Sequence, residues 1–371
     1  MKEIPLKKLH EQLGANFGEF AGWLVPMDYG SVIQEHQSVR KSVGIFDISH
    51  MGRIAIRGED SIYLLEKTFT KKIQKTKEGF MSGPTLALNY FARVIDDEML
   101  YRVSNTEFLS VPNAAYKDRM IGHLNEIAKN EKLRVTIDDL TDKYVMFAVQ
   151  GPKSPEAMEK IGLKDALELK PLQFMIQNAD MQNGVYLISR SGWTGEDGFE
   201  LWIRVEKGEE FYRKLLEAGA VPVGIAARDS LRMEMGFVLG GNEYGEDPRH
   251  YPCATSLRYG MGAIDWDKVG FIGEETLRAC RREGARWLRF GFIMRKEHSR
   301  YIPRKGSKIL VEDIEIGWIT SGSFSPVLER GIAQGYIDSR YAIVGEHVEI
   351  VDERGRKGTA KIEDFPLINR K

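Results

Sequence analysis

Short stretches of apolar residues, either alternating with polar ones or running together, recur along the chain and are typical of β-strands. They predict strands at residues 53–57, 99–103, 144–149, 287–294, 308–311, 331–336 and 347–351. Apolar residues spaced three and four apart predict helices at residues 116–132, 209–218, 228–239 and 274–282. Because strands and helices do not alternate regularly, the sequence predicts an α+β fold rather than a doubly wound parallel sheet.

Two further features refine this fold. Residues 280–371 consist of short strand-like runs joined by Gly, Pro and Asp turns, which predicts a small C-terminal β-barrel. Earlier in the chain, strand-like runs at residues 184–189 and 199–205 flank a connection rich in glycine and acidic residues. This pattern predicts a β-hairpin with a functional or solvated turn.

The hairpin connection reads SGWTGEDGFE at residues 191–200. Its glycines at positions 192, 195 and 198 allow positive φ and close approach of a flat ligand. Glu196 and Asp197 occupy the tip of the turn. A carboxylate has two adjacent acceptor oxygens, which match two parallel N–H donors such as those of a 2-aminopyrimidinone ring. The alternative is a solvated acidic loop.

Composition excludes several classes of function. The chain has 371 residues, 42% hydrophobic and 29% charged, with a net charge of −1, so we expect no nucleic-acid partner. No apolar run is long enough to span a membrane, and no signal peptide is visible. Two cysteines are too few for a disulfide framework, so we expect a cytoplasmic protein. The seven histidines show no metal-binding spacing.

A second acidic cluster ends an apolar strand. Asp96, Asp97 and Glu98 follow Val94 and Ile95. Most such clusters are polar turns that cap a hairpin. A carboxylate at a strand end can also project into a cleft, where it accepts a proton or orients a nitrogen nucleophile.

These motifs together resemble the T-protein of the glycine cleavage system, an aminomethyltransferase family that binds tetrahydrofolate. Residues 191–200 are similar to the family signature TGYTGEDGFE. Further similar segments follow in the family's order: FAGWLVPMDY at 20–29, VRKSVGIFDISHMG at 39–52, VIDD at 94–97, QGP at 150–152, GIAARDSLRME at 224–234, FIG at 271–273 and TSGSFSPVL at 320–328.

The resemblance implies a three-domain cloverleaf around a central pterin cleft. Domain 1 would be discontinuous, comprising residues 1–50 and 140–270, and would bind the pterin. Domain 2 would comprise residues 51–139 and carry Asp97. Residues 280–371 would form the C-terminal β-barrel domain.

The resemblance also assigns roles to residues. Asp97 matches the catalytic aspartate beside the reactive pterin nitrogens, with Asp96 as its support. Glu196 would bind the amino-pyrimidinone edge, and Arg228 would position a carboxylate or an anionic tail, unless it pairs with neighbouring Asp229. The remaining predicted cofactor-binding residues are Trp193, Met51 and Tyr29, each of which can also be a core residue.

The sequence departs from the family beside these motifs. Ala92 and Arg93 stand where most T-proteins have two glycines, Pro84 replaces a Tyr or Leu, and residues 239–243 and 251–263 are rewritten. These departures indicate that the one-carbon donor differs from that of the family, whereas the pterin acceptor is the same. They predict methyl transfer between a methyl-corrinoid protein, or another methylated donor, and N5 of tetrahydrofolate or tetrahydromethanopterin.

Two alternatives remain. One is a true aminomethyltransferase that acts on the aminomethyl-lipoyl arm of the H-protein and releases ammonia and methylene-tetrahydrofolate. The other is a non-enzymatic folate-binding protein in which the altered segments reflect loss of catalysis.

Overall fold

The computed structural model describes residues 1–177, 184–258 and 262–369. The chain forms two compact units, each assembled from segments that are distant in sequence. Unit 1 comprises Met1–Leu86, Asp96–Arg228 and Ile264–Lys268, and unit 2 comprises Ala87–Ile95, Asp229–Ala263 and Val269–Lys371. Helices and sheets are mixed without regular alternation, so the predicted α+β class is confirmed. The three predicted domain boundaries, and the cloverleaf arrangement, stay predictions.

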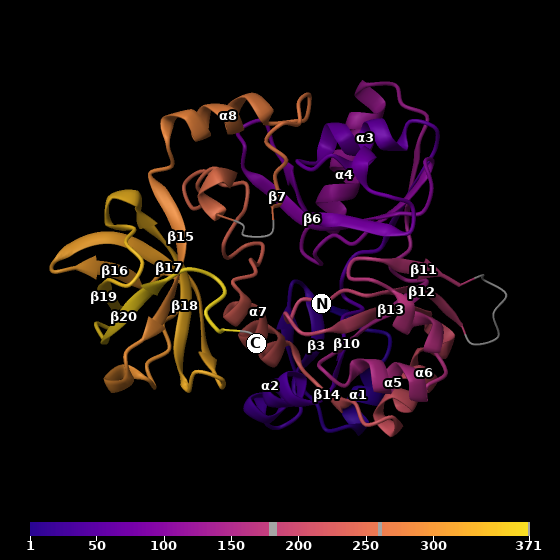
Figure 1. Ribbon diagram of the computed structural model, residues 1–371, viewed down its shortest axis with the longest axis horizontal. Helices are drawn as coiled ribbons and strands as arrows, with labels where there is room; N and C mark the ends of the chain where they lie inside the picture. Colours follow the sequence, from indigo (N-terminus) through magenta and orange to yellow (C-terminus); the bar gives the residue numbers. More distant parts are fainter. Residues whose placement is uncertain (178–183, 259–261, 370–371) are drawn as a thin grey trace. The chain divides into compact units, whose positions relative to one another are not determined.

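The larger sheet of unit 1 has the strand order β11-β12-β13-β10-β4-β14 (Figure 1). Helices α5 and α6 pack beside β13, and α2 packs beside β4. The core between sheet and helices is aliphatic and aromatic. The elements are α1 (Lys7–Gln12), α2 (Val32–Lys41), β4 (Gly44–Asp47), β10 (Tyr144–Gln150), α5 (Ser154–Lys160), η2 (Lys164–Glu168), β11 (Phe174–Ile176), β12 (Val185–Ser189), β13 (Gly198–Arg204), α6 (Val205–Glu217) and β14 (Val221–Pro222).

A second sheet in unit 1 carries the acidic cluster. Its strand order is β6-β7-β8-β5-β9, and helices α3 and α4 pack against each other beside it. The elements are β5 (Ile54–Arg57), α3 (Ser61–Thr68), η1 (Ile73–Lys75), β6 (Phe80–Leu88), β7 (Val94–Arg102), β8 (Glu107–Ser110), α4 (Lys117–Asn130) and β9 (Thr136–Asp139). Strands β6 and β7 are joined by a turn whose residues belong to unit 2.

A small third sheet of unit 1 has the order β1-β3-β2. It consists of β1 (Lys2–Glu3), β2 (Asn16–Phe20) and β3 (Trp23–Asp28). Phe20 pairs with Trp23, so only Ala21 and Gly22 connect β2 to β3. Both have positive φ, 52° and 81°, which is the conformation of a type I′ hairpin turn.

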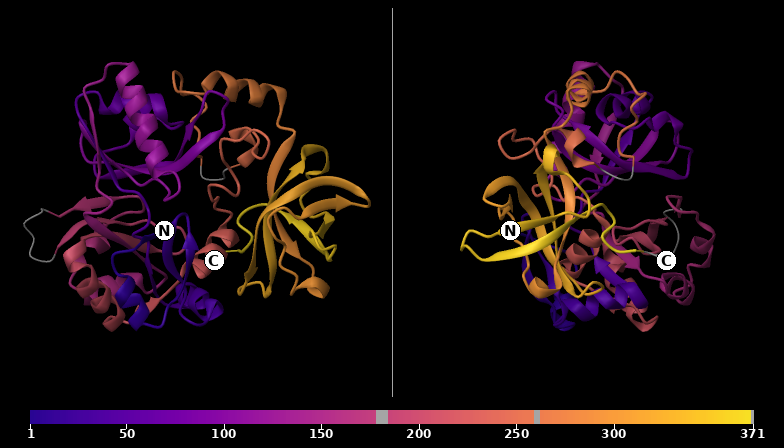
Figure 2. Two further views of the ribbon diagram at one scale, coloured as in Figure 1. Left: turned by 180° about the vertical axis from the view of Figure 1, so that it is seen from behind. Right: turned by 60° about the vertical axis from the view of Figure 1, so that its left-hand side comes forward.

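The C-terminal strands of unit 2 close into a barrel with the order β15-β18-β17-β16-β19-β20, which confirms the predicted β-barrel (Figure 2). Alternate residues of these strands point inward and form one apolar core. The elements of unit 2 are η3 (Ala254–Leu257), α8 (Glu274–Glu283), β15 (Trp287–Met294), η4 (Lys296–His298), β16 (Lys308–Val311), β17 (Ile314–Ser325), β18 (Arg330–Asp338), η5 (Ser339–Tyr341), β19 (His347–Val351) and β20 (Lys357–Glu363). Helix α7 (Ile225–Met235) begins in unit 1 and ends in unit 2.

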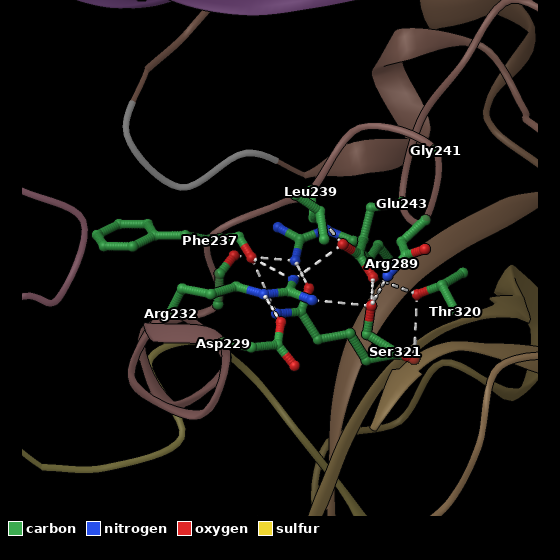
Figure 3. A network of polar contacts seen from close by, with 12 residues as sticks. Asp229, Arg232, Phe237, Leu239, Gly241, Glu243, Arg289, Thr320 and Ser321 are labelled. Atoms are coloured by element: carbon green, nitrogen blue, oxygen red, sulfur yellow. Dashed lines mark hydrogen bonds and ion pairs between the residues drawn. The ribbon is translucent and has the colours of Figure 1, made fainter. Parts of the chain in front are cut away.

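Unit 2 also contains a buried ion pair at the rewritten segment 239–243. Glu243 accepts hydrogen bonds from Arg232 Nη1 at 2.9 Å and from the backbone N–H of Leu239 at 2.8 Å (Figure 3). The hydroxyls of Thr320 and Ser321 donate to its other oxygen, at 2.7 and 2.6 Å. Burial alone would raise the pKa of Glu243, but the Arg232 guanidinium and these hydroxyls hold that pKa below its ordinary value.

Candidate functional site

The hairpin predicted around residues 191–200 forms as expected from β12 and β13, which pair antiparallel with Ser189 opposite Glu200. Strand β10 lies on the other side of β13 and places Gln150 opposite Gly198. The buried Gln150 amide donates to the Ser191 carbonyl at 2.9 Å and accepts from the Thr194 hydroxyl at 2.9 Å. Gln150 therefore fixes the conformation of the hairpin connection from inside.

This side chain also explains two of the three glycines, for a reason different from the one predicted. A Cβ at position 192 would lie 1.8 Å from Gln150 Oε1, and one at position 198 would lie 2.3 Å from its Nε2. Only Gly195 of the three has positive φ, at 78°. Gly192 and Gly198 are thus required by the Gln150 amide, and Gly195 by the turn.

The two carboxylates of the turn are held by different arginines. Arg40 Nη1, from α2, donates to Glu196 Oε1 at 2.7 Å and to the Thr194 carbonyl at 2.7 Å. The two side chains are only 8% and 14% exposed. Asp197 instead forms a bidentate pair with Arg190, at 3.0 and 2.7 Å. Glu196 is thereby oriented by a charge that has little contact with solvent.

The acidic cluster lies on β7, and its first two members share one partner. Asn113 donates from its backbone N–H and its amide to Asp96, each at 2.8 Å. The same amide donates to Asp97 Oδ1 at 3.2 Å. Asp97 is 6% exposed, so its carboxylate has limited access to solvent and a fixed neighbour. This geometry suits a carboxylate that orients or exchanges a proton with a substrate nitrogen.

The third member of the cluster, Glu98, has a strongly perturbed acidity. Burial raises the pKa of Glu98 well above its ordinary value, and the adjacent Asp96 and Asp97 raise it further. The Ser110 hydroxyl donates to Glu98 Oε2 and opposes this shift. Glu98 therefore stays protonated more readily than an ordinary glutamate.

The alternative predicted for Arg228 was an ion pair with neighbouring Asp229. Asp229 instead accepts a hydrogen bond from Arg232 at 2.8 Å. The environment of the Arg228 side chain is different. Its Nη1 is enclosed and has no hydrogen-bond partner within the described residues. Burial lowers the pKa of Arg228, while the charge of Glu200 opposes that shift. Glu200 accepts a hydrogen bond from the Ser191 hydroxyl at 2.6 Å, so Arg228 is electrostatically linked to the hairpin that carries Glu196.

His50, a buried histidine that was not among the predicted site residues, is affected by the charge of Arg228. Burial, followed by the charges of Arg228 and Arg53, lowers the pKa of His50 to about 3. Its Nδ1 has no hydrogen-bond partner in the part of the chain that the structure describes. The ring packs edge-on against Phe20 with centroids 5.6 Å apart. His50 is therefore a buried ring that stays neutral, and the charge of Arg228 favours this neutral form.

The position of Arg228 is fixed by its helix start. The backbone N–H of Gly224 donates to Glu35 Oε2 at 2.8 Å, and Glu35 Oε1 accepts from the backbone N–H of Tyr29 at 2.7 Å. A Cβ at position 224 would lie 2.2 Å from the Met27 carbonyl oxygen. Glycine is required here so that α7 can begin against the end of β3.

Tyr29 joins a buried hydrogen-bond series. Its hydroxyl lies 2.8 Å from His10 Nδ1, and His10 Nε2 lies 2.9 Å from Asp47 Oδ2. Burial raises the pKa of Tyr29, so its phenol stays protonated. The half-buried Tyr29 is thus a rigid wall residue as well as a hydrogen-bonding group.

Met51 and Trp193 are half-buried residues of unit 1. Met51 follows His50 in sequence, and the next residue, Gly52, donates from its backbone N–H to Pro112 at 2.9 Å. Pro112 precedes Asn113, so Met51 approaches the segment that contacts Asp97. Trp193 lies between Ser191 and Thr194 in the hairpin connection.

All six predicted site residues belong to unit 1. Two contacts that organise them had no assigned role in the sequence, those of Arg40 and Asn113. Arg40 lies in segment 39–52, which is similar to the family and could have indicated its importance. Asn113 lies in no such segment, so nothing in the sequence indicated its role.

The departures from the family have structural uses. Ala92 is buried and adopts a positive φ of 52°, a conformation that glycine takes without strain. Arg93 Nη1 donates to the Phe91 carbonyl at 3.0 Å within the same turn. Segment 239–243 supplies the buried Glu243 of unit 2. Residues 259–261 of the rewritten segment 251–263 lie outside the described residues.

No group of three or more His, Cys, Asp or Glu side chains in residues 1–177, 184–258 and 262–369 is arranged to hold a metal ion. Over the same residues, no helix is both long and apolar enough to cross a membrane.

Comparison with known proteins identifies the family. Residues 6–263 match the GCVT N-terminal domain, and residues 289–368 match the glycine cleavage T-protein C-terminal barrel domain. A probable aminomethyltransferase of Aeropyrum pernix is 57% identical over 98% of this chain and 96% of its own length. An aminomethyltransferase of Thermus thermophilus is 35% identical over 99% of both chains. The solved glycine cleavage system aminomethyltransferase T from Bartonella henselae is 30% identical, with a TM-score of 0.87 over 99% of this chain and 98% of that chain.

These comparisons confirm the T-protein-like fold and the enzyme class of one-carbon group transfer. They correct the predicted reaction. Methyl transfer from a methyl-corrinoid or other methylated donor was wrong, because the similar proteins carry the name aminomethyltransferase. Among the departures on which that prediction rested, segment 239–243 contributes Glu243 to a buried ion pair of unit 2.

Proposed function

Because this chain belongs to the glycine cleavage T-protein family, we propose that it is an aminomethyltransferase. Its donor is the aminomethyl-lipoyl arm of an H-protein, and its acceptor is tetrahydrofolate. The methylene carbon leaves the lipoyl sulfur and bridges two nitrogens of the pterin, while ammonia and a lipoyl thiol are released. The observation that carries this proposal is the 57% identity to a probable aminomethyltransferase along nearly the full length of both chains.

Two charged side chains, those of Glu196 and Arg228, are suited to bind a tetrahydropterin. Glu196 offers a carboxylate that is 14% exposed and oriented by Arg40, which suits the paired N–H donors of an amino-pyrimidinone edge. The enclosed Nη1 of Arg228, which has no acceptor within the described residues, suits a carbonyl or carboxylate oxygen of the substrate. We assign both as substrate-binding residues. Trp193, Met51 and Tyr29 are assigned as apolar and aromatic walls.

Asp97 is assigned as the catalytic residue. Its carboxylate is 6% exposed and receives the Asn113 amide, so it is positioned before substrate binds. A carboxylate in this setting can take a proton from a pterin nitrogen as that nitrogen bonds to carbon, and return it to the departing ammonia. Asp96, which Asn113 holds with two hydrogen bonds, positions the Asn113 amide.

The proposal is tested with purified chain, tetrahydrofolate and an H-protein whose lipoyl arm carries the aminomethyl group. We expect stoichiometric ammonia and methylene-tetrahydrofolate, both dependent on the pterin. A parallel reaction with tetrahydromethanopterin tests the choice of acceptor. Failure to release ammonia with tetrahydrofolate would reject the proposal, and activity with tetrahydromethanopterin alone would reject tetrahydrofolate as the acceptor.

A further inference from the structure

The two cysteines of the chain lie together in unit 2, whereas every site residue assigned above belongs to unit 1. Cys253 and Cys280 are both half-exposed and line the same cavity of about 350 Å³. Cys253 immediately precedes η3 and Cys280 lies on α8, and these two helices pack against each other. Arg93, Trp287 and Trp318 also line this cavity.

The Cys253 thiol affects the acidity of Cys280. Burial, followed by a hydrogen bond with the Cys253 thiol, raises the pKa of Cys280 to about 12, whereas the charge of Arg93 opposes that shift. Cys280 therefore keeps its proton at neutral pH, and we assign Cys253, which lines the same cavity, as the first nucleophile. A thiolate beside a second thiol and an arginine is the arrangement in which thiol–disulfide exchange proceeds.

The elements that carry these thiols both hold the turn between β6 and β7. The backbone N–H of Ala254, the residue after Cys253, donates to the Ala92 carbonyl at 2.9 Å. The hydroxyl of Thr276, one turn before Cys280 on α8, donates to the Tyr90 carbonyl at 2.8 Å. A disulfide between Cys253 and Cys280 would join η3 covalently to α8, and both of these elements hydrogen-bond to the turn.

We propose that Cys253 and Cys280 form a reversible disulfide that fastens η3 and α8 around the turn leading into β7. The oxidant is a small disulfide that carries carboxylates, because Arg93, Arg249 and Arg286 line the cavity. The proposal does not depend on the reaction that the enzyme catalyses.

The chemistry balances as two exchange steps. The Cys253 thiolate attacks one sulfur of the small disulfide, the S–S bond breaks, and one small thiolate leaves and takes up a proton. The Cys280 thiol then loses its proton as its sulfur attacks the Cys253 sulfur and displaces the second small thiolate. The protein dithiol is oxidised by two electrons, and the small disulfide is reduced to two thiols.

The test uses the full chain, freed of reductant and incubated with oxidised glutathione. We expect both thiols to disappear, with an intact mass lower by two hydrogen atoms and one peptide pair joined through Cys253 and Cys280. Dithiothreitol should restore both thiols. Two retained thiols, or glutathione stably attached to either cysteine of the native chain, would overturn the proposal.

Cysteine variants and unfolding temperatures distinguish the proposed Cys253–Cys280 disulfide from nonspecific oxidation. In Cys280→Ser the second exchange cannot occur, so Cys253 should retain one glutathione. Oxidised native protein should unfold roughly 5 °C or more above the reduced protein, because the link restricts the unfolded chain. The double variant Cys253→Ser with Cys280→Ser should unfold at one temperature whether or not oxidised glutathione is present. An identical unfolding temperature for oxidised and reduced native protein would contradict the fastening role.

Discussion

Arg40 Nη1 donates a 2.7 Å hydrogen bond to Glu196 Oε1, although the two residues are 156 positions apart in sequence. The pair joins α2 to the hairpin connection between β12 and β13. Arg40 also donates to the Thr194 carbonyl, so one guanidinium fixes both the carboxylate and the backbone beside it. If Glu196 binds the pterin edge, then Arg40 is a positioning residue for that contact.

Replacing Arg40 with methionine should therefore weaken tetrahydrofolate binding. We expect the KM for tetrahydrofolate to rise about tenfold, which corresponds to about 1.4 kcal/mol of binding free energy, while kcat changes less. The matched control is Arg190→Met, because Arg190 holds the neighbouring carboxylate of Asp197 on the same turn. An Arg40→Met enzyme whose KM equals that of Arg190→Met would contradict the positioning role.

Replacing Asn113 with alanine should affect the chemical step. Its amide contacts both Asp96 and Asp97, so its loss releases the Asp97 carboxylate from a fixed position. We expect kcat to fall about 10- to 100-fold with little change in the KM for tetrahydrofolate. Asn125→Ala is the control, since that exposed amide donates to the Ile121 carbonyl of its own helix. Steady-state kinetics with wild-type kcat in Asn113→Ala would reject this role.

His50 should make the protein less stable in acid. Its pKa is about 3 in the folded protein, against an ordinary value of 6.5, so the unfolded chain binds a proton that the folded chain does not. The free energy of unfolding therefore falls as the pH drops below 6.5. This residue contributes about 1.4 kcal/mol per pH unit.

The measurement is urea unfolding of wild type and His50→Gln between about pH 4 and pH 6.5. Glutamine does not titrate, so the variant should show the shallower dependence on pH even if it is less stable overall. Parallel curves for the two proteins would contradict the assigned burial of a neutral His50.

The hairpin turn at Ala21 predicts a stabilising substitution. Ala21 has a φ of 52° and Gly22 a φ of 81°, and asparagine is the residue best suited to the first position of such a turn. Ala21→Asn should raise the free energy of unfolding by about 0.5–1 kcal/mol. Gly22→Ala, which places a side chain at the other positive φ, should lower it. Equal stability of the two variants by chemical denaturation would show that the turn contributes nothing.

Strong local periodicity made much of the fold predictable. The strand at residues 287–294 matches β15 at both ends, because its alternating residues form one wall of the barrel core. Helix α7 was predicted at residues 228–239, so both of its predicted ends lie further along the chain than those of the structure, Ile225–Met235. It ends at Met235 because Gly236 has a positive φ of 75°, a stop signal that the apolar residues beyond it obscured.

The site was less predictable, because its contacts join distant segments. Glu196 and Asp97 were visible as acids at or beside strands. Gln150, which fills the hairpin connection, stood in the similar segment QGP but had no assigned role, and Asn113, which contacts Asp97, had no local pattern. The rewritten segment 239–243 was misread for a related reason. This segment contributes Glu243, which accepts a hydrogen bond from Arg232 inside unit 2. The sequence alone could not distinguish such a packing role from a change of reaction.

The central claim is that Glu196 binds the pterin and Asp97 acts on it. Measuring tetrahydrofolate affinity and single-turnover ammonia release for Glu196→Gln and Asp97→Asn in parallel tests this claim most directly. The account predicts that Glu196→Gln loses about tenfold or more in affinity, whereas Asp97→Asn binds normally and releases ammonia at least about 100-fold more slowly. Unchanged affinity in Glu196→Gln, or wild-type ammonia release in Asp97→Asn, would contradict it.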